Sequence, residues 1–307
     1  MTALPMRRIP FDFDDDLPFV WNPRNPSFST FMNIVSVFAV AFEKMLVAAV
    51  REALPSITDP AVAEEATDFL RQEGQHATCH RRHLKSLVAH YPGLQETFDE
   101  VIASYDELTA TKSVNYRLAY IADLEATFTP FFKLLLDNEE VLFRPGDDRV
   151  ASLLMWHFVE EVEHRSSALV VYDAVVDNDW YRVRVLPSVV KHLYAAARIV
   201  ADGMNEHVPF AERGMDANNI KPALSLRNAM IARIPWLRSD EPVPMPALGE
   251  VPWSQKITSA ARVLLSQTPF HDPAKEPLPE FADDWFKRYE RGDDVAHWYS
   301  STPTAAS

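Results

Sequence analysis

The feature that most restricts the fold of this chain is a Glu-x-x-His motif set in a long apolar segment. Residues 155–172 read MWHFVEEVEHRSSALVVY and contain His157, Glu161 and His164. With 3.6 residues per helical turn, positions i, i+4 and i+7 project from one face of a helix. The rest of that face is apolar or aromatic, so a carboxylate between two imidazoles would be costly to desolvate there. A metal ion is the simplest compensation, because it binds deprotonated carboxylate and neutral imidazole together.

The same motif occurs once more, earlier in the chain. Residues 69–83 read FLRQEGQHATCHRRH, in which Glu73 and His76 form a second Glu-x-x-His pair. Two further glutamates, Glu43 and Glu125, lie deep in apolar segments, one before each motif. Four-helix bundles hold a pair of iron or manganese ions with this set of residues. We therefore predict a dinuclear metal centre whose ligands come from four helices.

The spacing of the four glutamates fits such a bundle. The stretches from Glu43 to Glu73 and from Glu125 to Glu161 each leave room for one helix to turn and its neighbour to return antiparallel. The longer stretch between Glu73 and Glu125 leaves room for a long crossover connection.

Apolar periodicity and helix-ending residues predict an all-α fold. A chain with only 7 glycines against 23 prolines suits long helices separated by proline-containing connections. We expect an N-terminal arm at 1–26, a dimetal helical bundle at 27–206, and a Pro-rich C-terminal extension at 207–307 that wraps the bundle. The expected helices cover about 27–54, 60–90, 94–110, 113–138, 149–176 and 180–205, with short ones near 223–234, 253–267 and 279–291.

Charge and cysteine content exclude several function classes. A net charge of −14 argues against binding to nucleic acid, which needs clustered Lys and Arg. The single cysteine, Cys79, permits no disulfide framework and fits a reducing compartment, so we expect a cytoplasmic protein. No secretory signal is recognised at the N-terminus. The most apolar segment, 28–50, carries Glu43 and Lys44 in its middle, so we expect no membrane span. Residues 224–238 are basic and amphipathic, which fits either a helix laid on the bundle or contact with a membrane surface.

The motif set over residues 28–175 resembles the ferritin-like di-iron carboxylate superfamily. The His-x-x-x-Glu-x-x-His pattern that begins at His157 resembles p-aminobenzoate N-oxygenase, and that resemblance implies His157 as an additional ligand. The segments WHFVEEVEH and RQEGQHATCHRRH resemble more closely the bacterial family labelled predicted metal-dependent hydrolases. The expected ligands are Glu43, Glu73, His76, Glu125, His157, Glu161 and His164. Glu160 could reach the edge of the site or hold a ligand in place, and His80 could be a ligand itself, orient a ligand carboxylate or face the cavity.

Carboxylate and imidazole ligands without thiolate suit two iron ions, with manganese or zinc as alternatives. The resemblance favours an oxidase or oxygenase that uses dioxygen, and an electron-donor protein, to oxidise a small and largely apolar substrate. A metal-dependent hydrolase, in which the two ions activate water, is the alternative, and non-catalytic iron binding is the third interpretation. Exposed apolar helix faces also favour a homodimer.

Overall fold

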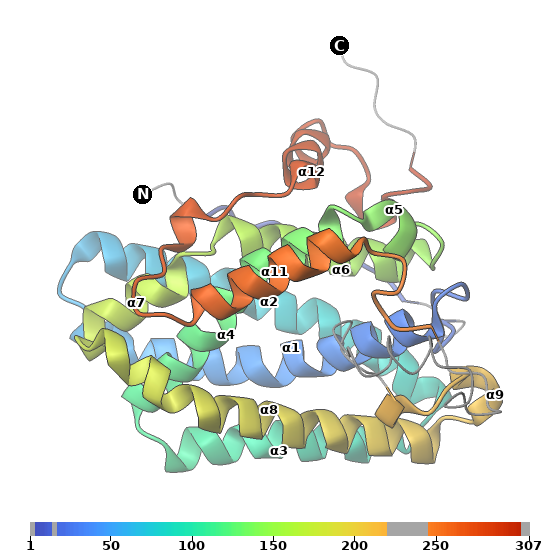
Figure 1. The fold of residues 1–307 in the computed structure, drawn as a ribbon, viewed down its shortest axis with the longest axis horizontal. Coiled ribbons are helices and arrows are strands. Elements are labelled where there is room, and N and C mark those ends of the chain that lie inside the picture. Colours follow the sequence, from blue (N-terminus) through green and yellow to red (C-terminus); the bar gives the residue numbers. More distant parts are fainter. Residues whose placement is uncertain (1–3, 14–16, 220–244, 302–307) are drawn as a thin grey trace.

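A computed structural model describes residues 4–13, 17–219 and 245–301, and all regular structure within these ranges is helical (Figure 1). The prediction of an all-α protein is therefore confirmed. The short helix predicted near 223–234 lies outside the described residues, as does the whole amphipathic segment 224–238.

The helices that carry the predicted ligands pack together as a bundle. They are α1 (Pro26–Ala53), α2 (Pro60–His90), α4 (Val114–Leu136) and α6 (Asp148–Glu163). Helix α1 contacts α2 and α4, and α6 also contacts α2 and α4, so the contacts close into a ring. Residues on the inner faces of all four helices can therefore meet at one point.

Each of these helices begins at a side chain that caps its first turn. Asn25, Asp59, Ser113 and Asp147 accept hydrogen bonds from backbone N–H groups that have no partner within the helix. Helices α1 and α2 then start with proline, whose missing N–H costs nothing at that position. The boundaries agree with the predicted ones to within a few residues because such local signals set them.

The crossover between α2 and α4 is itself helical. Helix α3 (Leu94–Thr111) packs on α1 and on α8 (Asp179–His207), and α8 also packs on α4 (Figure 1). Gly203 allows α8 to approach α3 closely, because a Cβ at this position would lie 2.0 Å from Thr97 Oγ1.

The helix predicted over about 149–176 is interrupted, and this prediction is wrong in one detail. Helix α6 ends at Glu163, and α7 (Ser167–Val176) starts after a short break. His164 follows the end of α6 with φ −93° and ψ 17°, and its carbonyl accepts from the Ser167 N–H at 2.8 Å. The Ser167 hydroxyl donates to Glu65 Oε1 at 2.8 Å, a contact with α2 that favours the break. His164 therefore lies at a helix end and not on a continuous helical face.

The described C-terminal residues pack against the bundle. Helix α11 (Trp253–Ser266) lies along α4, and α12 (Glu280–Glu290) contacts α6 (Figure 1). These two helices confirm the predictions near 253–267 and 279–291. The remaining short elements are α5 (Glu139–Leu142), α9 (Phe210–Arg213) and single 3₁₀ turns.

Two clusters of buried apolar side chains form the core. One joins the second half of α1 to α3, α8 and the first half of α4. The other joins the N-terminal arm and the first half of α1 to α6, the second half of α4 and the C-terminal residues. The segment Pro26–Ser56 is long and apolar enough to cross a membrane, but 72% of its most apolar window is buried inside the protein. Such burial is typical of the core helix of a bundle.

Candidate metal centre

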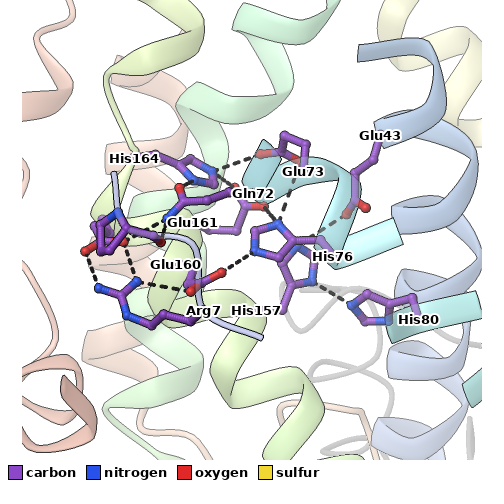
Figure 2. A network of polar contacts seen from close by, with 12 residues as sticks. Arg7, Glu43, Gln72, Glu73, His76, His80, His157, Glu160, Glu161 and His164 are labelled. Carbon is purple, nitrogen blue, oxygen red and sulfur yellow. Dashed lines mark hydrogen bonds and ion pairs between the residues drawn. The ribbon is translucent and has the colours of Figure 1, made fainter. Parts of the chain in front are cut away.

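All seven predicted ligands lie together in the interior of the bundle, and all but Glu125 are labelled in Figure 2. Their side chains fall into two groups, and within each group one ligand atom per residue lies within 4.8 Å of the others. Glu161 belongs to both groups. The first group adds Glu43, His76 and His157 to Glu161, and the second adds Glu73, Glu125 and His164.

Glu161 faces the two groups with different oxygens. Its Oε1 lies 2.8 Å from His157 Nε2 and 3.4 Å from His76 Nδ1, both in the first group. Its Oε2 lies 3.0 Å from His164 Nε2, in the second group. If each group held a metal ion, Glu161 would contribute to both sites.

Each histidine directs one ring nitrogen into the centre and the other to a supporting side chain (Figure 2). We define the supporting residues as Glu160, His80 and Gln72. His76 Nε2 lies 3.0 Å from Glu160 Oε2, His157 Nδ1 lies 2.7 Å from His80 Nε2, and His164 Nδ1 lies 2.9 Å from Gln72 Oε1. Such contacts fix the tautomer and ring orientation of metal-binding histidines. Glu160 and His80 thus occupy the supporting positions considered for them, outside both ligand groups.

Arg7 of the N-terminal arm contacts Glu160 directly and is linked to Gln72 through Glu163. Its guanidinium donates to Glu160 Oε1 at 3.0 Å and to both oxygens of Glu163 at 2.7 Å. Glu163 in turn accepts from the Gln72 amide at 3.1 Å. Arg7 also stacks over the ring of Phe286 on α12, at 4.7 Å from its centroid. The N-terminal arm and α12 therefore meet at the outer side of the centre.

The acidity of the buried carboxyls is strongly perturbed. Burial, with the charges of neighbouring carboxylates, raises the pKa of Glu43 and of Glu125 well above the usual range. Burial acts in the same direction on Glu161, but His164 and His157 outweigh it and hold the pKa of Glu161 well below its usual range. The pKa values of carboxyls in the same cluster are thus shifted in opposite directions.

The histidines are perturbed in opposite directions. Although burial opposes it, contacts with Glu160, Glu161 and Glu73 raise the pKa of His76. Contacts with Glu161 likewise raise the pKa of His164 to about 10. Burial and the charge of His76 lower the pKa of His157. The carboxylates around His76 and His164 thus favour the charged form of each imidazole, whereas the surroundings of His157 favour its neutral form.

Several inward-facing atoms need a partner that the protein does not supply. Among the described residues, Glu43 Oε2, both oxygens of Glu73, Glu125 Oε1 and His76 Nδ1 are buried without a hydrogen bond, and some of them have only ion-pair contacts, among them Glu73 Oε1 with His164 Nε2 at 3.1 Å and His76 Nδ1 with Glu161 Oε1 at 3.4 Å. Buried polar atoms are usually satisfied, and bound cations would satisfy these five. Four carboxylates also match the charge of two divalent ions. The residues present therefore fit a dinuclear metal site.

Aromatic rings pack around the ligands. Phe132 stacks on Phe158 at 4.0 Å and lies 6.2 Å from the His157 ring, and Trp156 lies 5.0 Å from the His76 ring. The one thiol, Cys79, lies outside both ligand groups, and burial raises its pKa to about 11. The centre is thus built from carboxylates and imidazoles in apolar surroundings.

Sequence reasoning missed Gln72 and Arg7. Gln72 directly precedes Glu73, and this adjacency to a predicted ligand is the signal in the sequence that could have found it. The structure shows that its amide is buried. Arg7 carries no such signal, because its contacts are with residues more than 150 positions away.

Comparison with known proteins adds one finding. Searches of curated proteins and of solved structures found no match. The family described as "predicted metal-dependent hydrolase" matches residues 5–234, which include all seven residues of the two ligand groups. The chain therefore belongs to the family of predicted metal-dependent hydrolases.

Proposed function

We propose that this protein is a hydrolase that uses two divalent metal ions held by Glu43, Glu73, His76, Glu125, His157, Glu161 and His164. The observation that carries the proposal is the position of Glu161, whose two oxygens face two separate groups of buried ligands. Membership of the family supports hydrolysis as the reaction.

Bound divalent ions would supply a water of lowered pKa and would polarise a carbonyl or phosphoryl oxygen of the substrate. The chain contributes the electrostatics and the geometry. The four glutamates balance the charge of two cations, and Glu160, His80 and Gln72 hold the imidazoles with one nitrogen directed inward. Phe132 and Phe158 exclude bulk water beside His157.

Oxidation with dioxygen is the second candidate. A set of carboxylate and imidazole ligands suits iron or manganese as well as zinc. The specific observation in its favour is the aromatic surroundings of the centre, where Trp156 and Phe132 pack on ligand imidazoles. Such surroundings suit a small, largely apolar substrate. This reaction would also need an electron donor.

The proposal extends to the type of bundle, the division of the chain and the cellular compartment. We propose that α1, α2, α4 and α6 form a ferritin-like bundle, that residues 1–26 and 207–307 are an arm and a wrapping extension, and that the protein works in the cytoplasm. The pairwise contacts of the four helices and the packing of α11 and α12 on α4 and α6 support the first two. A homodimer remains a proposal on the exposed apolar side chains of α8, Tyr194 and Val190.

The test is metal content followed by activity. The purified protein and the variant Glu161→Ala with His164→Ala are loaded with zinc, manganese or anaerobic ferrous iron and analysed for metal. We expect about two ions per chain in the wild type and loss of both in the variant. Glu64→Ala with His90→Ala is the matched control, because it also removes one glutamate and one histidine, and both side chains are exposed and outside the two ligand groups.

The loaded protein is then assayed on panels of esters and phosphoesters and, in the ferrous form, for oxygen consumption. Metal-dependent ester or phosphoester cleavage supports the hydrolase. Oxygen consumption without cleavage would replace it with the oxidase. Two bound metals with neither activity would indicate metal binding alone, and unchanged metal content in the double variant would refute the site.

A further inference from the structure

A large apolar cavity lies beside the metal centre. It encloses about 890 Å³ between α1, α4, α8 and α11. Its inner wall includes Ile34, Ala201 and Leu248, all less than 8% exposed, whereas Tyr194 and Leu264 at its edge are 69% and 74% exposed. This volume is at the upper end of the range of roughly 300–1,000 Å³ typical of small-molecule sites. The cavity therefore has a buried interior and a solvent-accessible mouth.

One buried cation lines this cavity. Lys256 of α11 is only 4% exposed, and its ammonium donates to the Leu248 carbonyl at 2.9 Å and lies 4.3 Å from the centroid of the Trp253 ring. Within the described part of the chain, its ammonium has no carboxylate within 4.0 Å. Burial lowers its pKa, as expected for a desolvated lysine.

An ammonium carries three donors, and a buried charge without a counter-ion is costly. One N–H of Lys256 donates to the Leu248 carbonyl, and the face of the Trp253 ring supplies only part of the attraction that a counter-ion would give. An anionic group of a ligand would complete the set. A second cation on the lining, Arg198, forms a long contact of 3.9 Å with Asp202, the one ion pair it has among the described residues, and adds positive potential.

Two aromatic rings lie between the cavity and the metal centre. Phe131 lines the cavity and lies 5.8 Å from the Phe132 ring, which lies 6.2 Å from the ring of His157. Two phenyl rings thus separate the apolar space from a proposed ligand. Phe131 of α4 and Phe38 of α1 both line the cavity, so its wall on this side is aromatic.

We propose that this cavity binds the substrate of the metal centre as an amphiphile, with an apolar chain in the cavity and one anionic group on Lys256. The substrate class is thus a long-chain or aryl-substituted anion of the fatty-acid type. The link to catalysis rests on the proposed function, whereas binding in the cavity does not need the metal. At about 30 Å³ for each water-sized group, the cavity holds a chain of a dozen carbons or more.

The test compares two probes that share a chain and differ in the head group, dodecanoate and dodecanol. Binding to the full-length protein is measured by titration calorimetry. We expect Lys256→Met to weaken dodecanoate binding about 10- to 100-fold, as for loss of a charge-assisted hydrogen bond, and to leave dodecanol binding unchanged. Lys191→Met is the matched control, since Lys191 is an exposed lysine on α8, and it should change neither. Ala260→Phe, which fills the cavity, should weaken both probes.

The outcomes separate this inference from the proposed function. Dodecanoate that binds the wild type no more tightly than dodecanol, or that is unaffected by Lys256→Met, would overturn the inference even if the protein holds two metals and is active. Glu161→Ala should bind dodecanoate as tightly as the wild type after losing its metal. Metal-free protein that still binds dodecanoate more tightly than dodecanol therefore supports the cavity site even where the metal-site hypothesis fails.

Discussion

The replacement of Glu160 by glutamine tests whether the supporting residues tune the metal centre. Glu160 accepts from Arg7 through Oε1 and faces His76 Nε2 through Oε2, each at 3.0 Å. Glutamine keeps the shape but turns one of these oxygens into an NH₂ group, which cannot accept. Either Arg7 loses an acceptor, or His76 loses the contact that holds its Nδ1 unprotonated and directed at the centre.

Loss of such a supporting contact typically costs 10- to 100-fold in metal affinity. At 1.4 kcal/mol for each factor of ten, Glu160→Gln should weaken metal binding by about 1.4–2.8 kcal/mol. The assay is competition between the protein and a metal chelator of known affinity. Circular dichroism before and after loading reports whether the variant is folded.

Glu163→Gln is the matched control for this measurement. Glu163 accepts from the same Arg7 guanidinium, but it touches none of the three imidazoles and its side chain is 21% exposed. It should therefore retain metal affinity within about threefold, less than the smallest change expected of a supporting contact. Equal affinity in the wild type and in Glu160→Gln, or equal weakening in both variants, would refute a specific role for the contact with His76.

Three further predictions concern pH, the N-terminal arm and helix packing. Burial and the charge of Glu161 raise the pKa of Glu125, and that of His164 is about 10, so metal binding near pH 7 must displace protons. Affinity should fall as pH is lowered from 8 to 6, and pH-independent binding would contradict the site. Arg7→Met removes the cation paired with the buried Glu160 carboxylate, which among the described residues then keeps only its contact with His76, and should lower the free energy of unfolding by about 3–5 kcal/mol, measured by urea denaturation. Gly203→Ala should destabilise by about 1–3 kcal/mol because the methyl meets α3, whereas Gly74→Ala, with open space around it, should stabilise by about 0.5–1 kcal/mol.

The ligand set was accessible to sequence reasoning because its signal is local. A glutamate and a histidine three residues apart on an apolar helix share a face wherever that helix lies. Glu73 with His76, and Glu161 with His164, are brought together as this spacing predicts, even though α6 ends before His164. Glu43 and Glu125 were recognised as carboxylates isolated in apolar segments, and both are buried in the centre. Their role as metal ligands stays a prediction until metal is measured.

The break after Glu163 shows where local reasoning stops. Periodicity alone favoured one helix through residues 164–166, because the apolar pattern continues into α7. The Ser167 hydroxyl contacts Glu65 on another helix, and this contact exists only in the folded bundle.

By itself, the sequence determined the helical class, most helix boundaries and which glutamates and histidines gather in one buried cluster, because caps, prolines and side-chain periodicity act over a few residues. The tertiary structure decided which side chains contact that cluster from outside and where the apolar cavity lies. Arg7 reaches Glu160 across 153 positions, and the cavity beside Phe131 exists only where α1, α4, α8 and α11 converge. Contacts of this kind depend on how whole helices pack, and no short stretch of sequence encodes them.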